Sequence, residues 1–111
     1  MGFKKYSAKK DPHSTVDFGR IWGDNPDTGE KGWLSENEEI ISSVWLISSS
    51  REEIPTLVEA SQGNGISVDK KSTAIWLEGG TAGFSYNLTN RIETNFTRKE
   101  DATGIVTVEE K

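Results

Sequence analysis

A two-residue alternation through residues 84–94 is the feature that most constrains the fold of this 111-residue chain. Successive side chains of a β-strand point to opposite faces, whereas a helix would spread the same residues around its circumference. The segment therefore predicts one long, half-buried strand. One face carries Phe84, Tyr86, Leu88, Asn90, Ile92 and Thr94, and the other carries Ser85, Asn87, Thr89, Arg91 and Glu93.

Short strand-forming segments recur through the rest of the chain, and no stretch has the spacing of an amphipathic helix. The turn residues 63–65 are expected to separate two of these segments, and the glycine-rich residues 79–83 to separate another pair. About seven short strands in a chain of this length predict an all-β antiparallel β-sandwich. Besides residues 84–94, the predicted strands are Val16–Trp22, Ile40–Ser48, Leu57–Ser61, Ile66–Val68, Thr73–Leu77 and Gly104–Glu109.

The composition excludes several classes of protein. Apolar residues make up only 32% of the chain, so the core must be thin, yet four tryptophans and four phenylalanines argue against disorder. No apolar run exceeds four residues, which excludes a membrane-spanning helix. The first residues also lack the apolar segment of a signal peptide, so we expect synthesis in the cytoplasm.

Catalytic and metal-binding residues are scarce. The chain has no cysteine, which excludes disulfide scaffolds, zinc fingers and thiol nucleophiles. His13 is the only histidine, which argues against a histidine metal cluster and a Ser-His-Asp triad. We therefore expect no metal, no other cofactor and no enzymatic activity.

Charge divides the chain into a basic N-terminal arm, residues 1–13, and an acidic domain, residues 14–111. The first ten residues hold four lysines and no acidic residue, whereas the remainder holds nine basic and eighteen acidic residues. An acidic body is not expected to bind nucleic acid. The arm is either a solvated terminus or a docking segment for an acidic neighbour. Its expected partner-binding residues are Phe3, Lys4, Lys5, Tyr6, Lys9 and Lys10.

A long acidic loop is expected over residues 23–39. Trp33 and Leu34 in its middle indicate that it folds back on the domain or inserts into a partner, and we interpret both as partner-binding residues. The loop's first residues suggest calcium, but an EF-hand pattern fails where Pro26 and Ser35 stand in ligand positions. A plain turn and an irregular calcium site remain as alternatives.

Two pairs of adjacent carboxylates and four tryptophans complete the candidate residues. Neighbours in an extended chain point to opposite sides, so the pairs at residues 38–39 and 52–53 are interpreted as solvated acidic surface. Trp76 lies on the opposite side of its strand from Ile75 and Leu77. It is therefore the leading candidate for an exposed aromatic residue at an interface.

Residues 83–89, with Leu77 upstream, resemble the tyrosine corner of Ig-like and fibronectin III-like sandwiches. In that corner a tyrosine near the start of a late strand bonds back to backbone a few residues earlier. The resemblance assigns this role to Tyr86, supported by Leu77 and Gly83, and implies an Ig-like or fibronectin III-like β-sandwich.

The longer string from Thr73 to Thr94 resembles that of the phage fiber-tail adaptors, which are small tail proteins; the similarity extends loosely over most of residues 10–108. The resemblance implies a structural virion protein, present in multiple copies in a ring, that connects the tail tube or nozzle to tail fibres. It implies synthesis in the host cytoplasm and a place in the virion, with tail proteins as partners and neither nucleic acid nor membrane. Two alternatives remain. One is a free-standing carbohydrate- or protein-binding module that uses Trp33 and Trp76, and the other is a head–tail junction protein of the same fold.

Overall fold

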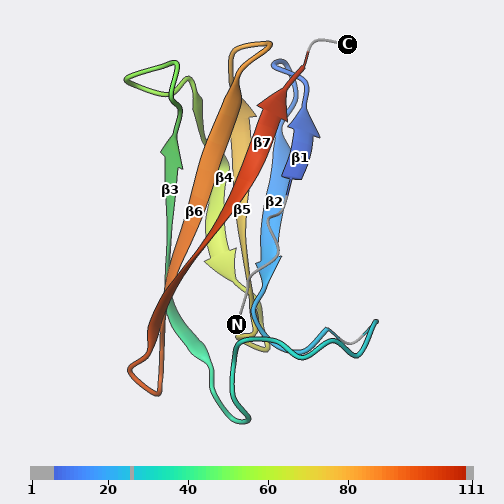
Figure 1. The fold of residues 1–111 in the computed structure, drawn as a ribbon, viewed down its shortest axis with the longest axis vertical. Helices are drawn as coiled ribbons and strands as arrows, with labels where there is room; N and C mark the ends of the chain where they lie inside the picture. The colour runs from blue at the N-terminus through green and yellow to red at the C-terminus, as the bar shows by residue number, and fades with distance from the viewer. Residues whose placement is uncertain (1–6, 26, 110–111) are drawn as a thin grey trace.

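The structure, a computed structural model, describes residues 7–25 and 27–109, which form seven β-strands in two sheets (Figure 1). These residues contain no helix, and therefore none long and apolar enough to cross a membrane. The all-β prediction is confirmed. The strands are β1 (Ser7–Lys10), β2 (Val16–Ile21), β3 (Ile40–Ser48), β4 (Leu57–Ile66), β5 (Ser72–Gly79), β6 (Ser85–Thr94) and β7 (Lys99–Val108).

The two sheets pack face to face. The larger sheet has the order β1-β7-β6-β3 and the smaller has the order β2-β5-β4. Neighbouring strands are antiparallel except for β1, which pairs parallel with β7. The N-terminal strand thus belongs to the larger sheet, although the sequence predicted an arm as far as residue 13.

The bounds of most strands follow the sequence pattern. β3 has the predicted ends, and the ends of β2, β5 and β6 differ from prediction by one or two residues. In β6 the predicted inward face is buried at Tyr86, Leu88, Asn90, Ile92 and Thr94. Because β6 lies between β7 and β3, this alternation orients the whole larger sheet.

The prediction of a turn at residues 63–65 is wrong. A single strand, β4, runs from Leu57 to Ile66 and pairs with β5 on both sides of an irregularity between Glu59 and Asn64. Gly63 takes a positive φ of 78° there, which a glycine adopts without steric cost. Extra residues in one strand of a pair bulge outward while the pairing continues beyond them, so the glycines serve a bulge rather than a hairpin.

The last strand begins earlier than predicted. β7 starts at Lys99 rather than Gly104, so charged residues form its first part. Lys99 lies opposite Glu93 and Asp101 lies opposite Arg91 on β6. Opposite charges in such cross-strand pairs stabilise a sheet, which explains why this charged segment is extended.

The core consists of two apolar clusters between the sheets. Their side chains come from both sheets, and burial of this apolar surface is the main favourable term in folding. The first cluster contains Phe18, Leu57, Ile75, Leu77, Tyr86, Leu88, Val106 and Val108, with Trp45 packed against it. The second contains Trp22, Leu34, Ile40, Ile92 and Ala102, with Trp33 packed against it.

A buried hydrogen-bond network centred on Asn90 joins the two sheets. Its Oδ1 accepts bonds from the Trp22 indole at 2.9 Å and from the Thr73 hydroxyl at 2.6 Å, both on the smaller-sheet side. Its Nδ2 donates to Ser43 Oγ at 2.9 Å and to the Val44 carbonyl at 3.2 Å, both on β3. A buried amide is stable only when its polar atoms find partners, and Asn90 satisfies this requirement across the sandwich.

Candidate functional site

Trp76 lies on the outer face of the smaller sheet. It sits on the central strand β5, directly opposite Asp17 of β2, and the residue is 39% exposed. Its neighbours Ile75 and Leu77 are buried on the other side of β5. The period-two geometry of the strand therefore presents one large aromatic ring to the outside.

A hollow of about 370 Å³ lies beside Trp76. It adjoins the irregular part of β4, which leaves its regular pairing with β5 between Glu59 and Asn64. Amide, hydroxyl and aromatic groups together provide both stacking and hydrogen-bonding capacity for a ligand or a partner side chain. Its polar and aromatic lining residues include Gln62, Asn64, Ser67, Ser72 and Trp76.

Two lysines of the basic arm, Lys9 and Lys10, lie within the described residues, and they differ in exposure. Lys9 is exposed and forms an ion pair with Glu109 at 3.7 Å. Lys10 is buried, and its Nζ donates to the Asp11 and Gly79 carbonyls at 2.7 Å each. Desolvation lowers the pKa of Lys10. Lys10 therefore fastens β1 to the end of β5 instead of facing a partner.

Four of the arm residues predicted to bind a partner lie outside the described residues. They are Phe3, Lys4, Lys5 and Tyr6.

The acidic loop folds back on the domain. The backbone N–H groups of Trp33 and Leu34 both donate to the Trp22 carbonyl, at 2.8 and 3.1 Å. Gly32 lies so close to Gly23 that a Cβ at that position would stand 2.1 Å from the Gly23 carbonyl oxygen. Only glycine can therefore stand at position 32, where the end of the loop passes close to its start.

The fold-back directs the two apolar residues of the loop into the domain. Leu34 is 8% exposed in the second core cluster, and the Trp33 ring packs edge-on against Trp22 with centroids 5.8 Å apart. The sequence left two interpretations of this loop, folding back on the domain or inserting into a partner, and in the structure the loop folds back. The side chain of Leu34 is not available to a partner, whereas Trp33 is only half-buried.

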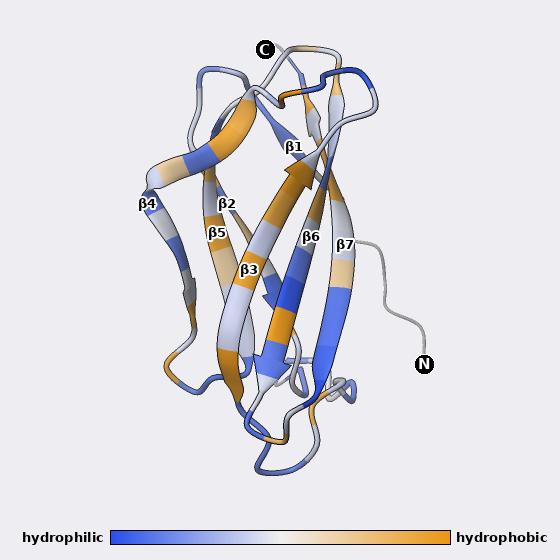
Figure 2. Ribbon diagram, turned by 90° about the vertical axis from the view of Figure 1, so that its left-hand side faces the viewer, coloured by the Kyte–Doolittle hydropathy of each residue, from blue (hydrophilic) through white to orange (hydrophobic). Residues whose placement is uncertain are grey.

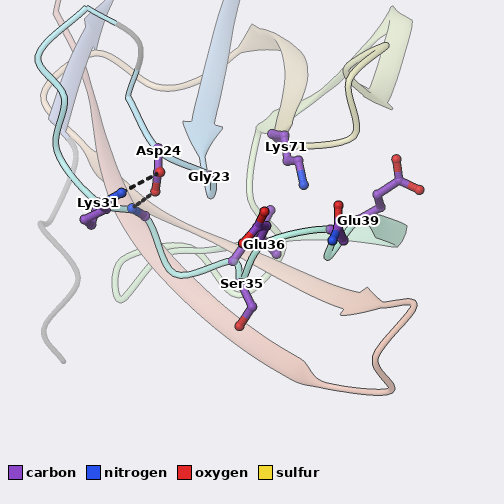
Figure 3. A pocket seen from close by; sticks show the side chains of 10 residues that line it. Gly23, Asp24, Lys31, Ser35, Glu36, Glu39 and Lys71 are labelled. Atoms are coloured by element: carbon purple, nitrogen blue, oxygen red, sulfur yellow. Dashed lines mark hydrogen bonds and ion pairs between the residues drawn. The ribbon is translucent and has the colours of Figure 1, made fainter.

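A hollow of about 920 Å³ lies at the base of this loop, with charged side chains around it (Figure 3). Asp24 accepts bonds from the Gly32 N–H at 2.9 Å and Lys31 Nζ at 3.3 Å, and the former is the larger cause of its lowered pKa. Figure 3 shows Glu36, Glu39 and Lys71 around the same space. The hollow is lined by both acidic residues and lysines, and the described residues include no group of three metal-ligating side chains.

Glu38 is completely buried, so its interpretation as solvated acidic surface is wrong. Its carboxylate accepts bonds from the Arg98 guanidinium, with Nε 2.9 Å from Oε2, from the Thr94 hydroxyl at 2.5 Å and from the Ser35 N–H at 2.9 Å. The bond to Arg98 is the largest cause that lowers the pKa of Glu38 to about 2. Arg98 also stacks on the Trp33 ring at 4.0 Å.

Glu52 is likewise tied into the fold. Tyr86 donates its hydroxyl to Glu52 at 2.5 Å and accepts the backbone N–H of Thr81 at 2.9 Å. The Tyr86 hydroxyl is the largest cause that lowers the pKa of Glu52 to about 2. Beside this network, Gly83 has a positive φ of 87° in the turn before β6.

The sequence is similar to one known protein family. A family model described as podophage GP4 fiber-tail adaptor protein gp77 matches residues 10–107. The match starts at the last residue of β1 and ends within β7, so it spans both sheets. No curated protein matches the chain.

Proposed function

The chain belongs to the podophage GP4 fiber-tail adaptor family, and we propose on this basis that it connects the tail tube or nozzle to tail fibres. The observation that carries the proposal is the family match over residues 10–107. A phage tail adaptor is a component of the virion and interacts with other tail proteins. In this role the protein is structural and catalyses no reaction.

The bonding of the buried polar groups supports a structural role. Glu38, Asn90 and Tyr86 each direct their polar atoms at other parts of the same domain. Groups held in this way stabilise and orient the fold rather than react with a substrate. The sandwich then serves as a rigid body that carries contact surfaces on its outside.

The contact surfaces that we propose are the Trp76 face and the basic arm. Exposed tryptophans are enriched among the residues that dominate binding energy at protein interfaces. The arm contributes positive charge ahead of an acidic body, and complementary charge between neighbouring tail proteins speeds and orients assembly. Buried Lys10 and Leu34 are not part of these surfaces. The arm residues proposed to contact partners are Phe3, Lys4, Lys5, Tyr6 and Lys9.

Assembly of phage particles tests this function. Particles made with a chain that lacks residues 1–6, or with Trp76→Ala, are expected to carry fewer fibres or less of this protein. Deletion stops before residue 7 so that β1 stays paired with β7. Phe96→Ala, at another exposed aromatic residue, is the matched control. Normal tails with bound fibres in the complete absence of this protein would overturn the proposal.

A sugar-binding module is the second candidate, and the hollow beside Trp76 is the observation that favours it. An aromatic face next to amide and hydroxyl groups suits a sugar ring, which stacks and hydrogen-bonds at once. Titration with glycans, followed by tryptophan fluorescence, separates the two functions. Saturable quenching that Trp76→Ala removes and Trp33→Ala retains would favour sugar binding.

A further inference from the structure

β3 is an edge strand that lacks, beyond an irregularity at its start, the features that usually protect sheet edges. It is the last strand of the larger sheet, and Figure 2 shows it nearest the viewer, with no other strand of that sheet beyond β3. Its nine residues include no charged residue, proline or glycine. An exposed edge of this kind offers unpaired backbone groups to another strand, and soluble proteins usually block it with charge, proline or a bulge.

The other three edge strands are protected. β1 has only four residues and carries Lys9 and Lys10, and β2 carries Asp17 and Arg20. β4 carries Glu59 and is irregular beyond it. β3 has an irregularity only near its start, between Ile40 and Ser42, and pairs regularly with β6 from there to Ser48.

Exposed apolar side chains are concentrated on the same strand. Of the nine exposed large apolar residues in the described part of the chain, three lie on β3: Ile41, Val44 and Leu46. In Figure 2, β3 shows no strongly hydrophilic segment, whereas β6 and β7 do. Across the sheet, Val44 lies opposite Arg91 and Leu46 opposite Thr89.

We propose that the β3 edge pairs with the β3 edge of a second copy of this chain, which extends the larger sheet across a two-fold axis. Charge favours a second copy as the occupant. The body of the chain is acidic, so two copies that meet through most surfaces bring carboxylates together, whereas two β3 strands bring none. The neighbouring Arg91 is already neutralised by Asp101, with bonds of 2.9 and 3.0 Å.

A two-fold axis makes such an interface self-complementary. In antiparallel pairing the outward residues of one strand meet those of its twin, so Val44 and Leu46 of both copies form one apolar cluster. The backbone bonds of the edge and the burial of this cluster act together. This inference stands on the fold alone and does not depend on the proposed function.

Engineered cysteines test the proposal in the 111-residue chain, which has no cysteine of its own. Ser42→Cys, Val44→Cys and Leu46→Cys sample exposed positions of β3, and Val58→Cys on β4 is the matched control. Under mild oxidation, at least one β3 variant is expected to form a disulfide-linked dimer about tenfold faster than the control, because paired Cβ atoms lie within disulfide reach. Equal rates for all four variants would overturn the proposal.

Sedimentation of the unlinked protein provides an independent measurement. The native chain is expected to dimerise with rising concentration, and Val44→Lys with Leu46→Lys to remain monomeric, because charge at the centre of a strand pair opposes pairing. Val58→Lys should dimerise like the native chain. A native chain that stays monomeric at every concentration, or a lysine pair that still dimerises, contradicts β3 self-pairing. The first of these results would leave the edge to a strand of another protein.

Discussion

Glu38 and Arg98 stand 60 residues apart in the chain, yet the guanidinium binds the buried carboxylate through two hydrogen bonds. Arg98 also donates to the Trp33 carbonyl at 3.2 Å and stacks on the Trp33 ring. One side chain from the β6–β7 turn therefore holds both ends of the segment from Trp33 to Glu38. This arrangement fixes the acidic loop to the larger sheet.

Removal of the Arg98 guanidinium should destabilise the fold, because Glu38 is a buried carboxylate. Arg98→Met retains an apolar stem but leaves the carboxylate without its charged partner, so the free energy of unfolding should fall by about 3 kcal/mol. Denaturant unfolding measures this loss. Arg91→Met removes the exposed pair with Asp101 and should cost far less stability, because solvent screens an exposed ion pair. Equal losses in both variants would show that burial adds nothing to the Arg98 contact.

Stability should fall in acid over a defined range. The folded-state pKa values of Glu38 and Glu52 are both about 2, whereas carboxyl groups of unfolded glutamates titrate near 4.3. Groups with lowered pKa stabilise the fold fully above the unfolded value and lose this contribution as the pH falls toward the folded value. The free energy of unfolding should thus decline between about pH 5 and 2. Glu38→Gln should flatten this slope, whereas an unchanged slope would contradict the assignment.

Removal of the Tyr86 hydroxyl should destabilise the fold, although the side chain keeps nearly the same shape. Tyr86→Phe keeps the ring in the core but removes the bonds to Glu52 and to the Thr81 N–H, so about 1–3 kcal/mol of stability should be lost. Tyr86→Phe should also lose less stability in acid than the native chain. The Tyr86 hydroxyl is the largest cause that lowers the pKa of Glu52, so without it the folded-state pKa lies closer to the unfolded value. Ser85→Ala, which loses only an exposed bond to Thr107, should have a far smaller effect.

The sequence predicts the features that follow from local periodicity. The alternation of residues 84–94 places Tyr86 and Asn90 in the core. The same alternation in β5 places Trp76 on the outside, because strand geometry alone determines which side each residue faces. The burial of Glu38 depends instead on Arg98, a partner 60 residues away that no local pattern indicates. The early start of β7 does have a signal in the sequence, because Lys99 and Asp101 carry charges opposite to those of their cross-strand partners Glu93 and Arg91.

The extended β4 strand shows a second limit of sequence reasoning. Residues 63–65 have the composition of a hairpin turn, but the fold uses them within a strand because pairing with β5 resumes at Asn64. Turn residues report which backbone angles are accessible, and a bulge and a hairpin both use positive φ. Only the position of the neighbouring strand distinguishes the two, and that is a long-range property. The same limit applies to the hollow beside Trp76, which adjoins this bulge.

Loss of the buried amide of Asn90 should weaken the joint between the sheets. Asn90→Ala leaves the Trp22 indole and the Val44 carbonyl each without one bond and opens a small void, so the free energy of unfolding should fall by about 2–3 kcal/mol. Thr89→Ala, at the adjacent outward position, removes only an exposed bond to Thr103 and is the matched control. Denaturant unfolding followed by tryptophan fluorescence measures both. If the two variants lose the same stability, Asn90 does not join the sheets energetically, and apolar packing alone holds them together.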